Sequence, residues 1–303
     1  IGGTVGGGGE LGMIARLRRW GELVTFSHTI FALPFAASAL VLALNEPHVP
    51  LTPLRVLAML GCMVTARTSA MAFNRWADRD VDAKNPRTKG RPVPAGRTSP
   101  REALALALGS GLAFCLIAAT LGFWPSVLAP PVLLVLLGYS LAKRFTWAAH
   151  AWLGLALALA PGGAWIAAGA APNLGIVLLM VAVVTWLFGF DVLYALQDEA
   201  FDRSEGLRSV PARFGARRAM LLAGLAHVVT IGCLAGTALA LRRGPVFLVG
   251  VALVAAILVV EHRLVRGKGG EADLAKIPKA FFDCNAYVSM GFFAATLIDA
   301  LVA

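Results

Sequence analysis

The chain of 303 residues is 58% hydrophobic and only 15% charged, with a mean hydropathy of +0.74. This composition excludes an ordinary soluble domain, which is about half apolar and a quarter charged. The net charge of +10 does not call for nucleic acid as a partner, because most of the basic residues fall in short loops between apolar runs, as in a multi-pass membrane protein.

The chain begins with a Gly-rich stretch, residues 1–16, which we interpret as a flexible tail before one membrane-embedded domain, residues 17–303. Nine apolar segments of about membrane-spanning length follow, which predicts an all-α membrane bundle. They lie at roughly 24–44, 54–74, 103–122, 125–141, 151–170, 174–193, 220–241, 245–262 and 281–302.

The distribution of Lys and Arg predicts how the bundle is oriented. If the N-terminus is cytoplasmic, most of the 27 basic residues fall in cytoplasmic segments. The loops on the other side keep only Arg55, Arg242 and Arg243. Because basic loops stay in the cytoplasm, we expect a multi-pass plasma-membrane protein whose N-terminus and long polar loops are cytoplasmic.

A first polar motif ends the second apolar segment. Asn74, Asp78 and Asp82 follow one another at intervals of four residues, a spacing that places them along one face of a helix. Asp80 falls off this face and is interpreted as solvated. Carboxylates aligned in this way repel one another unless a positive group lies between them, so the motif predicts a site for a hard divalent cation.

A second motif of the same kind ends the sixth segment. Asp191, Tyr194, Asp198 and Asp202 are separated by three, four and four residues, again on one helical face. Both motifs therefore lie at the cytoplasmic ends of their segments. The positions predict two related four-helix halves plus a ninth helix around a central cavity.

A long basic loop follows each motif. The first loop contains Arg87, Lys89 and Arg91, and the second contains Arg208 and Ser209. Mg²⁺ is rarely held by protein alone, so a phosphate-bearing ligand is implied, and basic loop residues match its charge. An amphiphile with a diphosphate head and an apolar tail, such as a polyprenyl diphosphate, suits both the acidic motifs and the lipid-facing bundle.

Together, the two motifs resemble the signature motifs of the UbiA superfamily of intramembrane aromatic prenyltransferases. The loop at 85–92, which reads NPRTKGRP, resembles the stretch after that family's first motif. Three further stretches resemble the 4-hydroxybenzoate polyprenyltransferase branch: FSHTIFALP at 26–34, YSLAKR at 139–144 and FFDCN at 281–285.

The resemblance implies nine transmembrane helices and a dependence on Mg²⁺, with two ions expected. The expected substrates are a polyprenyl diphosphate donor and an aromatic acceptor. Membrane lipid surrounds the protein, and no obligatory protein partner is expected. It assigns catalytic roles to Asp78, Asp82, Asp191, Asp198 and Asp202, and metal binding to Asn74, Asp78, Asp82, Asp198 and Asp202. Diphosphate binding is expected of Asn74, Arg87, Lys89, Arg91, Lys143, Tyr194 and Arg208, and acceptor binding of Arg67, Tyr139, Ser140 and Ser209.

Several of these residues have a plainer interpretation as well. Arg67 lies two helical turns before Asn74, where it binds a substrate carboxylate, neutralises a buried acid or donates to a carbonyl. Tyr194 is equally interpretable as an interfacial aromatic, and Lys143 as an ordinary basic residue at the end of a span. Asp191 is a candidate base for the ring proton. The five histidines, His150 among them, are scattered and interpreted as structural.

Two classes of function are compatible with intramembrane acids. An ion-coupled transporter is the alternative to the prenyltransferase, but it favours acids near the bilayer midplane on broken helices. Here the acids lie at the ends of spans beside basic loops, which favours the enzyme. Its acceptor is predicted to be 4-hydroxybenzoate, with another quinone precursor, haem or a glycerol-phosphate lipid as alternatives.

Overall fold

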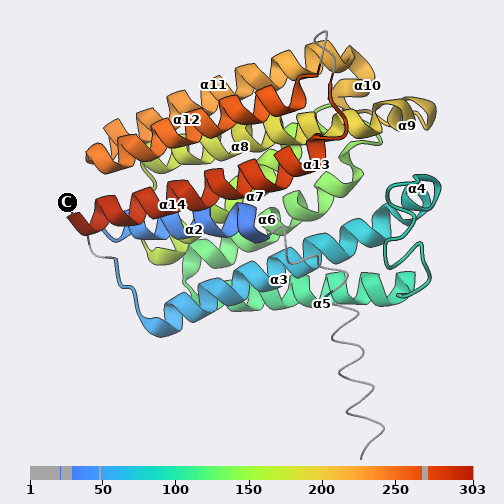
Figure 1. Cartoon of the computed structure of the whole chain (residues 1–303). Coiled ribbons are helices and arrows are strands. Elements are labelled where there is room, and N and C mark those ends of the chain that lie inside the picture. The colour runs from blue at the N-terminus through green and yellow to red at the C-terminus, as the bar shows by residue number, and fades with distance from the viewer. Residues whose placement is uncertain (1–20, 22–28, 48, 268–271, 303) are drawn as a thin grey trace, which may run out of the picture.

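The computed structural model of the protein describes residues 21, 29–47, 49–267 and 272–302, which form a bundle of helices (Figure 1). The long helices are α2 (Thr29–Ala43), α3 (Pro53–Ala77), α5 (Pro100–Thr120), α6 (Phe123–Ala142), α7 (Ala149–Ala168), α8 (Leu174–Ala195), α11 (Ala216–Ala240), α12 (Pro245–Val265) and α14 (Asn285–Val302). Short helices connect them: α4 (Arg79–Lys84), α9 (Glu199–Ser204), α10 (Val210–Phe214) and α13 (Ile277–Lys279).

Within this described part, eight helices are long and apolar enough to cross a membrane. The first predicted segment corresponds to α2, whose described apolar stretch, Phe31–Ala43, is shorter than the others. Its predicted start at residue 24 and the predicted tail, residues 1–16, lie outside the described residues. The other predicted segments differ from the helices by only a few residues at each end.

Local sequence explains where several long helices begin. Thr52, Ser99 and Asn173 each accept a hydrogen bond from the backbone N–H three residues ahead, at 3.2, 3.1 and 3.1 Å respectively. Pro53 and Pro100 follow the first two caps, where a missing N–H costs nothing and the fixed φ suits a helix. These caps are local signals that fix where the three helices begin.

The pairing of the helices repeats along the chain. The most extensive packing joins α3 to α5 and α8 to α11, the second and third helices of each predicted half. Helix α7 bridges the halves by packing against α2, α6 and α8. This arrangement agrees with the two related halves expected from the positions of the acidic motifs.

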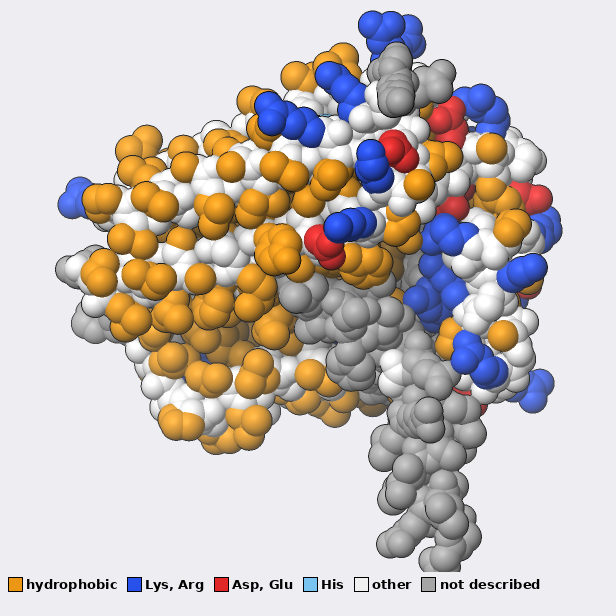
Figure 2. Space-filling model, in the orientation of Figure 1, with side chains coloured by type: hydrophobic (Ala, Val, Ile, Leu, Met, Phe, Trp, Pro, Cys, Tyr) orange, Lys and Arg blue, Asp and Glu red, His pale blue; other side chains and the backbone are white. Residues whose placement is uncertain are grey.

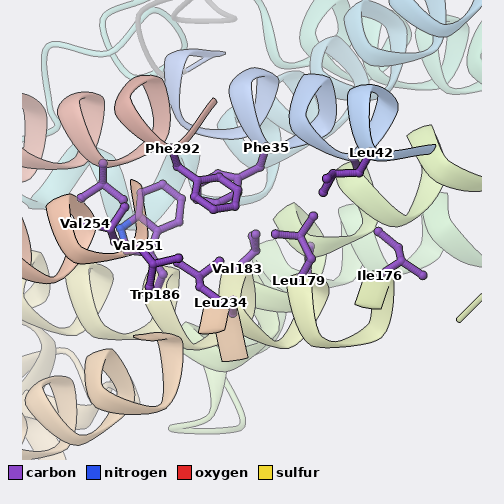
Figure 3. Packing of buried hydrophobic residues seen from close by; sticks show 14 of the residues in the cluster. Phe35, Leu42, Ile176, Leu179, Val183, Trp186, Leu234, Val251, Val254 and Phe292 are labelled. Carbon is purple, nitrogen blue, oxygen red and sulfur yellow. The ribbon is translucent and has the colours of Figure 1, made fainter. Parts of the chain in front are cut away.

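The best-packed core surrounds α8, which carries the second acidic motif. Phe35 of α2 contacts Trp186 of α8 with ring centroids 4.9 Å apart, and Phe292 of α14 stacks on Phe35 at 5.3 Å (Figure 3). All three rings are almost completely buried. Because lipid tails are as apolar as these side chains, it is close packing that holds the helices together.

Helices α7 and α8 approach each other closely at Gly154. A Cβ atom at this position would lie 2.5 Å from the carbonyl oxygen of Val184, so only glycine fits. One turn before Gly154 on α7 is His150, and two turns after Val184 on α8 is Asp191. The close contact therefore brings these two polar side chains together.

The charged residues gather at one end of the bundle. Figure 2 shows hydrophobic side chains over most of the visible face and most of the Lys and Arg toward the end where α4, α9 and α10 lie. Both acidic motifs reach this end, the first through α3 and α4 and the second through α8 and α9. The site is therefore built at the margin of the apolar bundle.

Candidate active site

The first motif runs from α3 into α4 without losing its face. The backbone N–H of Asp78 donates to the Asn74 carbonyl at 2.9 Å, and that of Asp82 to the Asp78 carbonyl at 2.8 Å, although α3 ends at Ala77. The Asn74 amide donates to Oδ2 of Asp78 at 3.0 Å. The expected alignment of the three polar side chains thus agrees with the backbone.

Residues at the end of α6 complete the surroundings of Asp78. Lys143 Nζ lies 3.1 Å from Oδ2 of Asp78, and Arg144 lies 3.8 Å from Oδ1. Asn74 also donates weakly to the Ser140 hydroxyl, at 3.4 Å. Lys143, expected to bind diphosphate, and Ser140, expected to bind the acceptor, therefore both lie next to the first motif.

The first basic loop folds back over Asp82. Arg91 Nη1 lies 2.8 Å from both carboxylate oxygens of Asp82, whose side chain is only 4% exposed. Thr88 donates its hydroxyl to the Asp82 carbonyl at 3.2 Å. The loop is thereby fixed to the motif that precedes it.

The same loop reaches the second motif through Arg87. Its Nε donates to Oδ1 of Asp198 at 3.1 Å and its Nη1 to the Tyr194 hydroxyl at 3.1 Å, while Nη2 pairs with Oδ2 of Asp198. Asn85 adds a hydrogen bond to Asp198 at 3.2 Å. Burial is the largest single influence and lowers the pKa of Arg87, but the hydrogen bond to Asp198 and the attraction of Asp198, Tyr194 and Asp82 together raise that pKa above its usual value.

The second motif is not one regular helix. A 3₁₀ turn, Leu196–Asp198, separates α8 from α9, so the regular α-helical period is interrupted between Tyr194 and Asp202. The motif is therefore not one regular α-helix, although Arg87 contacts both Tyr194 and Asp198. The short turn lets Asp198 meet Arg87, while Asp202 faces the hydroxyl of Ser209, its hydrogen-bond partner.

Asp191 lies deeper, against a histidine that the sequence did not single out. His150 Nδ1 is 2.6 Å from Oδ2 of Asp191, and the backbone N–H of Val210 donates to His150 Nε2 at 3.3 Å. Because Nε2 accepts a hydrogen bond, the neutral ring carries its proton on Nδ1 and donates it to Asp191. The spacing of histidines in the sequence carries no signal for this contact.

The two motifs enclose one polar cavity of about 200 Å³. From the first half of the chain it is lined by Asn74, Asp78, Asp82, Arg87, Arg91, Tyr139 and Lys143, and from the second by Asp198 and Asp202. Four carboxylates and four potential cationic or phenolic groups therefore converge from segments far apart in the sequence. Asp191 does not line this cavity.

Other predicted residues lie elsewhere. Lys89 is exposed on the loop outside the cavity, and Arg208 and Ser209 line a separate, neighbouring cavity. Arg67 lies deeper on α3, within electrostatic range of Tyr139. Tyr139, which lines the cavity, lies within range of Asp78 and Asp191, so polar groups extend from the cavity toward Arg67; we call this set the polar level below the cavity.

Arg75 was given no role in the sequence analysis. Its side chain is buried, and its Nη1 lies 3.4 Å from the Asn74 amide oxygen. An Arg that directly follows the first residue of an intramembrane polar motif was the available signal. The buried guanidinium places a fixed positive charge behind the motif.

The oxygen donors of the cavity suit a hard cation such as Mg²⁺. Among the described residues no three acidic, His or Cys side chains form a ready-made metal cluster. Instead Asp78, Asp82 and Asp198 each contact a basic side chain. The residues therefore fit Mg²⁺ that arrives with a phosphate ligand, because phosphate oxygens complete its coordination and can engage the same basic side chains.

Comparison with known proteins agrees with this geometry. The family model described as the UbiA prenyltransferase family matches residues 32–285. The chain is 31% identical over 280 residues to a 4-hydroxybenzoate octaprenyltransferase of Aromatoleum aromaticum, covering 92% of this chain and 90% of that protein. A 4-hydroxybenzoate octaprenyltransferase of Dechloromonas aromatica is 32% identical over 250 residues, covering 79% of each.

Solved structures give the same fold. The apo structure of a UbiA homolog from Aeropyrum pernix K1 superposes with a TM-score of 0.79 at 31% identity, covering 90% of this chain and 98% of that one. A UbiA homolog from Archaeoglobus fulgidus bound to GPP and Mg²⁺ has a TM-score of 0.74 at 19% identity, covering 93% and 99%. These similarities favour the enzyme over the transporter.

Proposed function

The chain belongs to the UbiA prenyltransferase family, and we propose that it transfers a polyprenyl group from an allylic polyprenyl diphosphate to 4-hydroxybenzoate in quinone biosynthesis. The observation that carries the proposal is the meeting of both acidic motifs and the basic side chains around one cavity at the end of a membrane bundle. The names of the relatives support the acceptor.

The cavity offers complementary groups for a metal-bound diphosphate. Arg87, Arg91 and Lys143 now lie on carboxylates, so ligand binding exchanges their partners: the cations turn to phosphate oxygens and the carboxylates to metal. Asn74, Asp78, Asp82, Asp198 and Asp202 are the proposed metal ligands. Two Mg²⁺ ions, when bound, neutralise charge on the leaving diphosphate. Lys89 and Arg208 take no part in this proposed set.

The protein's own residues then serve the transfer in three ways. The basic side chains hold the diphosphate as the allylic C–O bond breaks and its electron pair leaves with the oxygen. The apolar helices around the site exclude water, which would otherwise quench the allylic cation. A C–C bond forms to the ring carbon beside the phenol hydroxyl, and a base takes the proton from that carbon.

The polar level below the cavity is the proposed acceptor site. Arg67 provides a charge for the carboxylate of 4-hydroxybenzoate, and Tyr139 and Ser140 lie between it and the first motif. Asp191 is the proposed base. His150 holds one of its oxygens through a hydrogen bond at 2.6 Å.

The proposal includes the placement of the enzyme in the cell. The charged end of the bundle, with the N-terminus, faces the cytoplasm, and nine helices, of which α2 is the first, cross the plasma membrane. At the other end of the bundle, the basic groups among the described residues are Arg55 near the start of α3 and Arg242 and Arg243 between α11 and α12. The diphosphate group of the donor and the water-soluble acceptor then reach the site from the cytoplasm.

A transfer assay on purified protein tests the reaction. It supplies geranyl or geranylgeranyl diphosphate and 4-hydroxybenzoate with Mg²⁺ or with EDTA, and identifies product by mass. Prenylated 4-hydroxybenzoate that disappears with EDTA supports the reaction, metal and acceptor together. Mg²⁺-dependent binding of the diphosphate without product would overturn 4-hydroxybenzoate as acceptor while keeping the donor site.

A further inference from the structure

A second cavity, of about 270 Å³, lies beside the first at the charged end of the bundle. It is formed by the segment after α9, the short helix α10 and the connection between α6 and α7. Leu207 lines both cavities, so the two are neighbours separated by little more than one side chain. No role in the proposed reaction requires this second cavity.

Three arginines line it. Arg208 donates to the Phe145 carbonyl, and its own backbone N–H donates to the Lys143 carbonyl at 2.8 Å. The guanidinium of Arg213 lies over the Trp147 ring, 5.6 Å from its centroid. Arg203 pairs with Glu199 at 2.9 Å. Arg208 and Arg213 are thus held by neutral groups, and Arg203 is held by the carboxylate of Glu199.

The charge of this cavity differs from that of the first. Throughout the described ranges, neither Arg208 nor Arg213 forms an ion pair with an acidic side chain. In the first cavity each of the three basic residues lies on a carboxylate. The second cavity therefore carries uncompensated positive charge, and its guanidinium groups repel one another unless an anion lies between them.

The remaining walls are suited to a ligand at a membrane margin. Trp147, Leu207 and Ala212 provide apolar surface next to the arginines, and Ser209 provides a hydroxyl. Trp side chains are typical of the boundary between lipid and water. Guanidinium groups match phosphate oxygens in shape and charge and remain charged at any physiological pH.

We propose that this second cavity binds the phosphate group of a ligand distinct from the reacting donor. Two sources carry that chemistry: the headgroup of an anionic phospholipid, and a soluble diphosphate. The position of the cavity also gives it a connection to the site. Two residues beyond Arg208, the backbone N–H of Val210 contacts His150, which holds Asp191. A phosphate at Arg208 therefore steadies the segment that positions Asp191.

The test compares two double variants of the full-length protein by native mass spectrometry from detergent. Arg208→Gln with Arg213→Gln removes two charges from the cavity. Arg217→Gln with Arg218→Gln removes two charges from the first turn of α11, where both side chains are exposed outside it. The probes are dihexanoyl phosphatidylglycerol, dihexanoyl phosphatidylcholine and inorganic pyrophosphate, all in EDTA.

The fraction of protein with one anionic probe bound is expected to fall by about tenfold or more in the cavity variant. The control variant should match the wild type. Selective loss of phosphatidylglycerol identifies a lipid headgroup, and selective loss of pyrophosphate identifies a soluble diphosphate. Equal retention by both double variants would overturn the proposal. If the cavity variant does not fold, Arg213→Gln alone, which leaves the contact of Arg208 with Phe145, gives the same comparison against Arg217→Gln.

Discussion

Arg87 and Asp198 lie 111 residues apart in the sequence and share two hydrogen bonds, through Nε at 3.1 Å and through Nη2. This contact joins the loop after the first acidic motif to the second motif. Because the pair lines the cavity, its members are placed to separate when a metal-bound diphosphate enters, one turning to phosphate and the other to metal.

Replacement of Arg87 tests this exchange. Arg87→Ala removes a charged donor to phosphate, so we expect the KM for the prenyl diphosphate to rise by about tenfold to hundredfold. Lys89→Ala is the matched control on the same loop, because Lys89 lies outside the cavity. Steady-state kinetics with varied donor measure both variants. Equal increases in both would show that the loop acts through its overall charge.

The acidic motifs are tested by neutral isosteres. Asp78→Asn and Asp198→Asn each remove a proposed metal ligand, so we expect turnover to fall by at least about a hundredfold in each. Asp80→Asn is the control, since its side chain is 79% exposed and off the cavity. The product is quantified by mass, and gel filtration in detergent reports folding. Folded Asn variants with wild-type turnover would remove the metal-site assignment.

His150 is expected to act as a positioning residue. His150→Leu leaves Asp191 without its donor and Val210 without its acceptor, so we expect kcat to fall by about tenfold to hundredfold at saturating donor and acceptor. His150→Asn places an amide N–H near the position of Nδ1 and is expected to restore part of the activity. Identical kcat values for the Leu and Asn variants would show that the ring acts by packing alone.

The proposed acceptor site predicts a discrimination between acid and ester. Arg67→Met removes the charge facing the acceptor carboxylate, so the KM for 4-hydroxybenzoate is expected to rise by about tenfold or more while that for the donor stays unchanged. The methyl ester of 4-hydroxybenzoate is the control acceptor. The wild type should prefer the acid and the variant should not. An unchanged preference for the acid would place the carboxylate elsewhere.

The close approach of α7 and α8 predicts a stability effect. Gly154→Ala puts a Cβ against the Val184 carbonyl and is expected to destabilise the protein by about 1–3 kcal/mol, seen as a lower Tm in detergent. Gly163→Ala, on the same helix with open space around it, should be neutral or stabilising. Similar Tm values for the two variants would mean that the helices can separate at Gly154 without cost.

The sequence predicted the elements of the site better than their contacts. Asn74, Asp78 and Asp82 lie on one face as their spacing requires, because the hydrogen bonds of α3 continue across Asp78. The second motif departs from a regular α-helix at Leu196–Asp198, where a 3₁₀ turn follows α8. At this turn Asp198 contacts Arg87 and Asn85, residues more than a hundred positions away that the spacing of the motif does not reveal.

By itself the sequence determined the membrane class, the helical segments and the two acidic ends, because apolar length and helical period are local properties of the chain. The tertiary structure alone decided that Arg87 meets Asp198, that His150 meets Asp191, and that Arg208 turns to a second cavity. These outcomes depend on how closely the helices pack, as at Gly154, and on which loops their ends bring together. Contacts between distant segments follow from the shape of the whole bundle, and no local pattern encodes that shape.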